Sequence, residues 1–297
     1  MLKTLSQRTR INTEVRSRKS EVGTRKPEVK KSSSEAGSGS LGSGQIMKNK
    51  IFKMYESDLL SQATGDTLRP GGFFLTDLGV KSCDFLPDAR VLDVGCGCGA
   101  TVERLVSLYQ LQAIGLDPSE LLLESGRRKN SDLNLIRGQG EDLPFPAENM
   151  DGVFAECALS VMEDLDQVLK EIFRVLKPSG WLVINDVYAR NPDGLLGLQE
   201  LKLESCIRRA LPKERLVNKL VEQGFKIVDW TDHTNLLTQL TVDLIMAHGS
   251  MIQFWLKTTA CSCSGAESAE TSLVQTVLKQ AKMGYFQLIA QKDAHCS

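Results

Sequence analysis

The 297-residue sequence lacks several features that mark special classes of protein. It has no run of about 18 or more apolar residues, so we expect no membrane-spanning helix. The nearest candidate, residues 236–256, contains Thr, Gln, Asp, His and Ser and predicts an amphipathic helix instead. The N-terminal region has no continuous apolar core, so a secretory signal is not expected. His233 and His248 lack metal-ligand spacing from the cysteines, so we expect no zinc site.

The chain also lacks a net positive charge. Its formal net charge is −1, but residues 1–46 hold ten Lys or Arg and four Glu, which leaves −7 for the other 251 residues. An acidic folded part has no built-in attraction for phosphates, so nucleic acid is not an expected partner. Without an apolar span, a membrane is not an expected partner either. Eight Cys without a secretory signal indicate free thiols in a reducing compartment, so we expect a cytoplasmic location.

Residues 1–46 differ in composition from the rest of the chain. Glu recurs every seven residues from position 14 to position 35, each time followed by one small apolar residue. A coiled coil needs two apolar positions in each heptad, so this repeat does not predict helix pairing. A Ser- and Gly-rich linker follows, and we expect 1–46 to be a disordered basic tail. An organelle transit peptide is one alternative, which the four Glu disfavour. The favoured interpretation is that Met47 is the true start, and residues 47–297 are expected to form one folded domain.

From residue 85 onward, short apolar runs alternate with segments of helical spacing. Strands are expected at residues 90–94, 112–116, 133–136, 152–156 and 181–187. Helices are expected at 101–109, after an N-cap at Ser119, and at 166–176. This order predicts an α/β fold with a parallel sheet and helices on both faces. Closing strands are expected at 225–230 and 284–291, with two cap helices inserted before the last strand, at about 232–283.

A glycine-rich loop follows the first expected strand. After Asp93 come Gly95, Gly97 and Gly99, and then a helix. Glycine permits positive φ and lets a ligand approach the backbone, and the helix offers unpaired N–H groups to an anion. Asp117 ends the second strand, about 20 residues on, where a carboxylate can accept hydrogen bonds from both ribose hydroxyls. The pattern therefore predicts a site for a nucleoside cofactor.

Two cofactors fit this topology, a nicotinamide dinucleotide and S-adenosylmethionine. The dinucleotide fingerprint separates its second and third glycines by two residues, whereas one residue separates Gly97 from Gly99. Asp93 would repel a pyrophosphate but suits an ammonium group. At this point residues 85–190 resemble the class I S-adenosylmethionine-dependent methyltransferases, in particular the type 11 methyltransferase domain. An NAD-dependent oxidoreductase and a non-catalytic cofactor-binding module remain alternatives.

The resemblance extends to four further segments. Gly138–Phe145 resembles the family's loop beside the adenine, and Gln139, in place of the usual Asp, can still accept from the adenine amino group. Asp151–Glu156, Arg174–Gly180 and Tyr285–Ala290 resemble the fourth strand, the turn before the fifth and the last strand. The resemblance implies a Rossmann-like, seven-stranded sheet with one antiparallel strand. The cofactor-binding residues that it implies are Asp93, Gly95, Cys96, Gly97, Gly99, Asp117, Pro118, Gln139, Gly140, Glu141, Asp142, Glu156 and Cys157.

The expected function is methylation of a small-molecule acceptor. A sulfonium is an intrinsically good methyl donor, so the protein mainly has to hold the acceptor in line with it. No residue stands out as a general base, and the catalytic residues therefore stay unassigned. Thr67–Gly72 is a candidate nest for the cofactor carboxylate, with an ordinary Pro-Gly turn as the alternative.

The cysteines give the one lead to the acceptor. Glu156–Ala158, Asn185–Ala189 and Cys206 resemble segments of the arsenite methyltransferases, whose thiolates hold trivalent arsenic. This resemblance implies Cys157, Cys206 and Asp186 as substrate residues, although Cys83 lacks the glycine expected after the family's upstream cysteine. The alternative is that these thiols are small apolar fillers. Cys261 and Cys263, in the expected cap, are a further candidate pair for a thiophilic substrate or a redox reaction.

Overall fold

A computed structural model describes residues 54–201, 205–258 and 267–294 of the chain. The expectations for residues 1–46, for a start at Met47 and for Cys261 and Cys263 fall outside this part. The strands are β1 (Arg90–Val94), β2 (Gln112–Asp117), β3 (Leu135–Arg137), β4 (Met150–Glu156), β5 (Leu176–Ala189), β6 (Phe225–Asp232) and β7 (Met283–Lys292). The helices are α2 (Asp58–Thr64), α3 (Phe74–Cys83), α4 (Ala100–Tyr109), α5 (Glu120–Lys129), α6 (Leu165–Val175), α7 (Leu195–Glu200), α8 (Lys213–Glu222), α9 (Thr234–His248), α10 (Met251–Thr258) and α11 (Glu267–Ala281).

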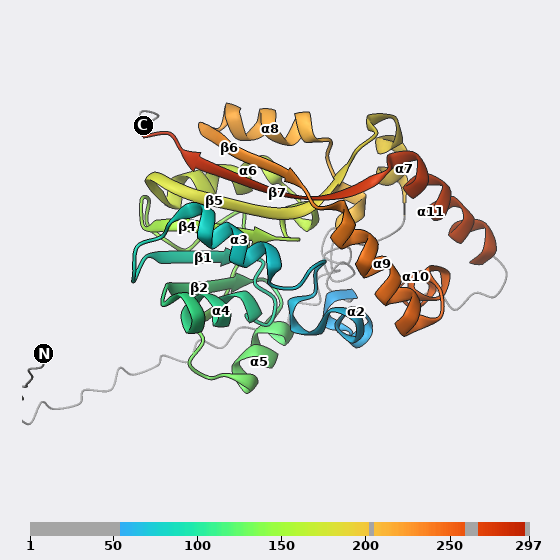
Figure 1. The fold of residues 1–297 in the computed structure, drawn as a ribbon, viewed down its shortest axis with the longest axis horizontal. Coiled ribbons are helices and arrows are strands. Elements are labelled where there is room, and N and C mark those ends of the chain that lie inside the picture. Colours follow the sequence, from blue (N-terminus) through green and yellow to red (C-terminus); the bar gives the residue numbers. More distant parts are fainter. Residues whose placement is uncertain (1–53, 202–204, 259–266, 295–297) are drawn as a thin grey trace, which may run out of the picture. The chain divides into compact units, whose positions relative to one another are not determined.

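The strands form one sheet in the order β3-β2-β1-β4-β5-β7-β6 (Figure 1). Strands β1 to β5 pair in parallel, and β7 runs antiparallel to both β5 and β6. The sequence-based prediction of a mostly parallel, seven-stranded α/β sheet with one antiparallel strand is confirmed. The carboxyl ends of the parallel strands lie at one edge, where open α/β sheets bind their ligands.

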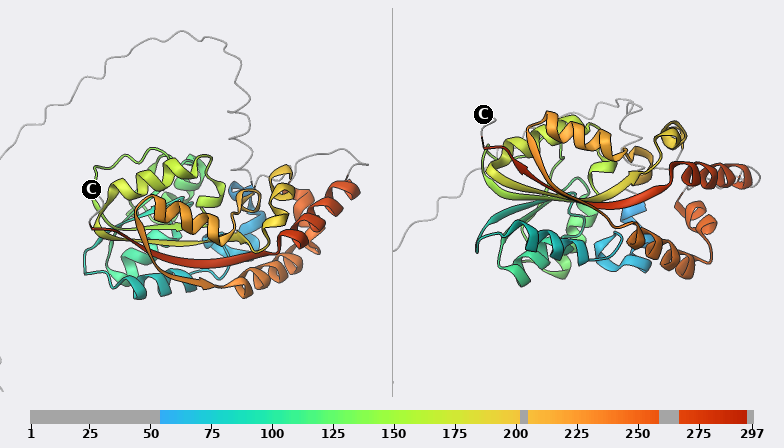
Figure 2. Two further views of the ribbon diagram at one scale, coloured as in Figure 1. Left: turned by 90° about the horizontal axis from the view of Figure 1, so that it is seen from above. Right: turned by 45° about the horizontal axis from the view of Figure 1, so that its top comes forward.

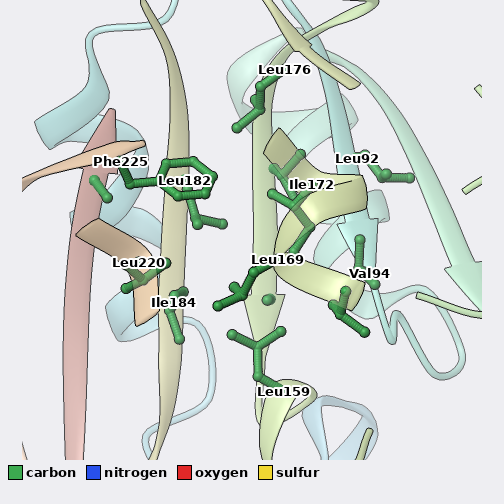
Figure 3. Packing of buried hydrophobic residues seen from close by; sticks show 14 of the residues in the cluster. Leu92, Val94, Leu159, Leu169, Ile172, Leu176, Leu182, Ile184, Leu220 and Phe225 are labelled. Atoms are coloured by element: carbon green, nitrogen blue, oxygen red, sulfur yellow. The ribbon is translucent and has the colours of Figure 1, made fainter. Parts of the chain in front are cut away.

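Alternating side chains along the strands build a core on each face of the sheet. Leu92 and Val94 of β1 pack with α6 and α8 on one face, while Val91 packs with α3, α4 and α5 on the other. Figure 3 shows the first of these cores, in which Leu169 and Ile172 of α6 lie against the sheet. Both of these side chains are almost fully buried, and burying one leucine-sized side chain contributes about 1.5–3 kcal/mol.

A helical cap, made of α9, α10 and α11, is inserted between β6 and β7. Together with α2 and α7 it gathers at one end of the sheet, as both views of Figure 2 show. Gly249, with a φ of 86°, ends α9, so the cap holds three helices where the sequence predicted two. The Nε2 atom of His248 lies 2.8 Å from the carbonyl oxygen of Leu59, which ties α9 to α2. Within the described residues, no helix combines the length and the apolar content that crossing a membrane requires.

Local signals explain the helix boundaries near the site. The Ser119 hydroxyl accepts a hydrogen bond from the N–H of Leu122, which confirms the predicted N-cap of α5. Helix α6 ends at Val175, one residue before the predicted end at residue 176, because Leu176 already has an extended conformation and pairs with Met150 of β4. Ser179, with a φ of 61°, then forms the tight turn in β5.

Candidate active site

The glycine-rich loop between β1 and α4 depends on its backbone conformation. Gly95, Gly97 and Gly99 have φ angles of 78°, 56° and 81°, in the region that favours glycine. The N–H of Gly95 donates to the carbonyl of Leu116 at 2.7 Å and so fastens the loop to β2. A Cβ atom on Gly95 would lie 2.6 Å from the Cβ atom of Ala158, so the loop passes too close to the end of β4 to carry a side chain there.

Asp117, at the end of β2, faces this loop. Its Oδ2 atom accepts from the N–H of Gly97 and its Oδ1 atom from the N–H of Ser119, both at 2.8 Å. Burial raises the pKa of the Asp117 carboxyl, and the two hydrogen bonds oppose that rise. Each carboxylate oxygen has a second acceptor position, so the side chain can hold the loop and still accept from a ligand's hydroxyl groups.

Asp93 is a buried carboxyl at the start of the loop. It is 3% exposed, and its side chain makes no hydrogen bond to another residue in the described part of the chain. Burial and the charge of Glu156 raise the pKa of Asp93 well above its usual value, while the charge of Arg69 lowers it. A cation that reached Asp93 would therefore meet a carboxyl group with no hydrogen-bond partner of its own.

Glu156, at the end of β4, is by contrast fully engaged. Its carboxylate accepts from the Thr76 hydroxyl at 2.8 Å, the Thr101 hydroxyl at 2.7 Å and the Asn185 amide at 2.7 Å. Arg69 completes the cluster with an ion pair at 2.9 Å, and both side chains are almost fully buried. The Arg69 Nε atom is buried and has no hydrogen-bond partner within the described residues, so one donor of this cluster is left open.

These groups line one cavity, which we call the glycine-loop cavity. Of the predicted cofactor residues, those that line it are Asp93, Gly95, Cys96, Gly97, Asp117, Pro118, Gln139, Gly140, Glu141, Glu156 and Cys157. Gly99 and Asp142 do not. Gly99 is the N-cap of α4, where a Cβ atom would meet Leu135 at 2.8 Å. The N–H of Asp142 closes a turn by donating to the Gln139 carbonyl at 3.2 Å.

The segment before α3 adds lining residues, and only some of them belong to the predicted nest for the cofactor carboxylate. Tyr55 and residues 66–69 line the glycine-loop cavity together with the loop itself. The Arg-Pro-Gly-Gly motif signalled part of this segment, since Arg69 belongs to the predicted Thr67–Gly72 nest. Tyr55 had no such signal, because neither a motif nor a clear periodicity surrounds it.

A second cavity, of about 640 Å³, lies under the cap, and we call it the cap cavity. Its size falls within the range of small-molecule sites, roughly 300–1,000 Å³. Its walls come from α2, α9, α10, α11 and the ends of β5 and β7, and they are mainly apolar. Tyr55, Leu68 and Cys157 line both cavities, so these three residues form a junction between them.

Two thiols and two phenols surround the junction. The Cys157 sulfur lies 3.4 Å from the Tyr285 hydroxyl, and the N–H of Cys206 donates to the Tyr55 hydroxyl at 3.3 Å. Burial and the nearby charge of Asp186 raise the pKa of Cys157 well above its usual value and that of Cys206 to about 12. Burial raises the pKa values of both tyrosines as well. All four side chains are therefore neutral near pH 7, and none of them is a ready general base.

Comparison with known proteins agrees with this geometry. Residues 92–184 match the family model of a methyltransferase domain. The chain is 29% identical over 154 residues to the O-methyltransferase rstn1 of Aspergillus nomiae, a match that covers 48% of this chain and 67% of that protein. It is 37% identical over 111 residues to a demethylmenaquinone methyltransferase of Symbiobacterium thermophilum, covering 34% and 43% of the two chains.

Residues 92–184 form a methyltransferase domain of the class I S-adenosylmethionine-dependent type. The matches to these two relatives span about two thirds and less than half of the relatives' own lengths. Among solved structures, the [4+2]-cyclase SpnF has a TM-score of 0.63 and 24% identity, and the match covers 84% of this chain and 96% of that one. This last likeness shows the fold, and the name of SpnF illustrates that one fold can serve different reactions.

The glycine-loop cavity fits the cofactor of this family, S-adenosylmethionine. The cofactor carries an ammonium group, a carboxylate and two ribose hydroxyls. The cavity is lined by the Asp93 carboxyl, which has no hydrogen-bond partner in the described residues, by the Arg69 guanidinium group, and by Asp117, which has free acceptor positions. The charges of these side chains are therefore opposite to those of the cofactor's ammonium and carboxylate groups, and Asp117 offers acceptors to its hydroxyl groups.

Asp186, which the resemblance implied as a substrate residue, is a buried residue of β5. It lines neither of the two cavities. Its carboxylate accepts from the hydroxyl and the N–H of Ser160 at 2.6 Å and 3.0 Å, and from the N–H of Val187 at 2.7 Å. It therefore fastens the segment that follows β4, which includes Cys157, to the end of β5.

The stability of the protein is expected to depend on the ionisation of Asp186. Burial raises the pKa of this carboxyl to about 6 from a reference value of 3.8. Between those values the folded state binds more protons than the unfolded state, so stability falls as the pH rises through this window. The shift corresponds to roughly 3 kcal/mol. Urea unfolding of Asp186→Asn and the unsubstituted protein should show that the variant gains relative stability as the pH increases. A free-energy difference that is constant across the window would contradict this.

Proposed function

We propose that the protein transfers the methyl group of S-adenosylmethionine to a small, largely apolar organic acceptor bound in the cap cavity. The junction of the two cavities at Tyr55, Leu68 and Cys157 is the observation that carries the proposal. The cofactor supplies an intrinsically reactive methyl group. The protein's part is to hold the acceptor in line with that group and to exclude water.

Four side chains are proposed to orient the cofactor. Asp93 would bind its ammonium group, and the Arg69 guanidinium group would attract its carboxylate. Asp117 would accept from the ribose hydroxyls, and Gln139 would accept from the adenine amino group. These contacts leave the junction as the place where an acceptor in the cap cavity would approach the methyl group.

The walls of the cap cavity favour an apolar acceptor. They include Leu237, Leu244, Phe254 and Trp255, of which Leu244, Phe254 and Trp255 are at most 7% exposed. Because the thiols and phenols at the junction are neutral, the acceptor has to be nucleophilic by itself or to arrive already ionised. The name of the O-methyltransferase relative is compatible with an oxygen acceptor.

An arsenite-type acceptor is the second candidate. One observation favours it, because Cys157 and Cys206 both line the cap cavity. Two observations weigh against it. Cys83 is buried among the apolar residues between the sheet and α3, away from the cavity. The raised pKa values of the two cavity thiols also make the thiolates that bind a soft ion harder to form.

A labelling experiment tests the organic acceptor. The protein is incubated with S-adenosylmethionine that carries a trideuterated methyl group and with a metabolite extract, and products are detected by their mass shift. Leu244→Trp fills the cap cavity and should lower labelled product by roughly tenfold or more. Its binding of S-adenosylhomocysteine should be unchanged.

The matched control is Met246→Trp on the same helix. Met246 is 81% exposed and does not line the cap cavity, so this variant should label the product at the normal rate. Equal labelling by Leu244→Trp and the unsubstituted protein would contradict the assignment of the cap cavity. A product that forms only when trivalent arsenic is added would favour the second candidate.

A further inference from the structure

The cap cavity has an uneven distribution of charge. The charged residues that line it are Arg190, Lys279 and Lys282, and no described Asp or Glu lines it. All three cations are exposed, so they lie at the mouth of the cavity, while its walls are apolar. None of them lines the glycine-loop cavity. We call these three residues the cationic rim.

The fold brings the rim together from two parts of the chain. Lys279 lies in the last turn of α11, and Lys282 lies between α11 and β7 with a φ of 50°. Arg190 directly follows β5, and both its N–H and its Nε atom donate to the carbonyl of Lys282, at 3.3 Å and 3.0 Å. These bonds link the segment after β5 to the start of β7, so the rim has a defined position on the cavity.

The charge of the rim is only partly balanced by neighbouring residues. Asp232 lies within electrostatic range of Arg190, but its carboxylate already accepts from the hydroxyls of Tyr188 and Thr234. Neither Lys279 nor Lys282 forms an ion pair with a residue in the described ranges. The two lysines therefore carry most of the uncompensated charge.

The rest of the cavity offers few polar groups to a ligand. Thr238 and Thr241 of α9 line it, but their hydroxyls donate to the helix carbonyls of Thr234 and Leu237 at 3.1 Å and 2.9 Å. The Ser205 hydroxyl also lines the cavity, and it is buried with no hydrogen-bond partner in the described residues. A ligand in this cavity therefore meets mainly apolar walls along its body, one such hydroxyl at Ser205, and cations at the mouth.

We infer that the acceptor is an amphipathic anion, with an apolar body in the cap cavity and a carboxylate, sulfonate or phosphate group on the cationic rim. This rests on the proposed function in that the bound molecule is the methyl acceptor. The rim would fix one end of the molecule, which leaves its reacting atom at the junction. Such anchoring by a remote group is one way to convert binding energy into orientation.

A matched pair of fluorescent probes tests the inference. 8-Anilinonaphthalene-1-sulfonate and N-phenyl-1-naphthylamine share an apolar body, and the first alone carries an anionic group. We expect the sulfonate to bind about tenfold more tightly, and Lys279→Glu/Lys282→Glu to remove this advantage while binding of the neutral probe stays within about twofold. Raising the salt concentration should weaken the binding of the sulfonate alone.

Two variants control the experiment. Lys257→Glu introduces the same charge change on α10, at an exposed residue that does not line the cavity, and should leave both affinities unchanged. Leu244→Trp should weaken both probes, which places them in the cap cavity. Equal affinities for the two probes, or equal losses of both in the lysine double variant, would overturn the inference.

Displacement of the sulfonate probe by dodecanoate, dodecyl phosphate and dodecanol separates the possible anions. Both anions should compete better than the alcohol, and the better of the two identifies the group that the rim prefers. Failure of the proposed function can be told apart from failure of this inference, because probe binding needs no methyl transfer. Rim binding without any labelled product would overturn the function and leave the anion site in place.

Discussion

Replacing Asp93 by Asn should weaken the binding of S-adenosylhomocysteine by at least about 30-fold. The substitution preserves the shape of the side chain but removes the negative charge proposed to face the ligand's ammonium group. Removing one partner of a buried, hydrogen-bonded charge pair costs about 2–5 kcal/mol. Asp93 is 3% exposed, so water cannot readily replace the lost partner. Titration calorimetry of the folded variant measures the change directly.

Asp142→Asn is the matched control for this prediction. Asp142 belongs to the same predicted set of cofactor residues, but the structure places it outside the glycine-loop cavity. Its substitution should leave the affinity within about twofold, as expected for a surface change away from the ligand. Unchanged affinity in Asp93→Asn, or an equal loss in both variants, would show that the ligand's amino group binds elsewhere.

Replacing Arg69 by Met should lower the free energy of unfolding by about 3–5 kcal/mol, because breaking a buried ion pair leaves an uncompensated charge. Arg69 balances Glu156 at 2.9 Å and also opposes the charge of Asp93, and the side chains of the ion pair are 6% and 2% exposed. Methionine replaces the aliphatic part of the arginine side chain, so most of the apolar packing should be kept. Urea unfolding, followed by circular dichroism, gives the free-energy difference.

Two further variants separate the charge effect from other causes. Arg104→Met breaks the more exposed pair with Asp77 and should cost only about 1 kcal/mol. In Arg69→Met/Glu156→Gln the neutral amide no longer needs a cation, so part of the lost stability should return. Equal costs for the two arginine variants, or no recovery in the double variant, would mean that the buried charge cluster is not what makes Arg69 important.

Local patterns predicted much of the fold. The apolar runs placed the strands correctly within a few residues, because a buried parallel strand needs a continuous apolar stretch between turn residues. Ser119 marked the start of α5 because its hydroxyl is the partner of a free helix N–H. The cap was harder to predict from the sequence, since its helices pack on α2 and α7 through contacts between distant parts of the chain. A break at Gly249 gives no strong signal by itself.

Some residues of the site could also be predicted from local sequence, and others could not. The glycine loop and Asp117 could be predicted because their role depends on backbone conformation and on position after a strand. Asp186 and Asp142 were placed near the ligand by resemblance alone, and neither lines one of the two cavities. The Asp186 carboxylate holds the segment after β4, and the Asp142 side chain is exposed. Tyr55 and the cationic rim come from segments far apart in the sequence, so only the folded chain brings them to a common cavity.

The most direct test of the two-cavity account is a crystal structure of the protein with S-adenosylhomocysteine. The account predicts the amino group within about 3.2 Å of the Asp93 carboxylate and the ribose hydroxyls at the same distance from Asp117. It also predicts that the sulfur atom faces the junction of Tyr55, Leu68 and Cys157. A sulfur atom that faces away from this junction, with no path to the cap cavity, would contradict the account.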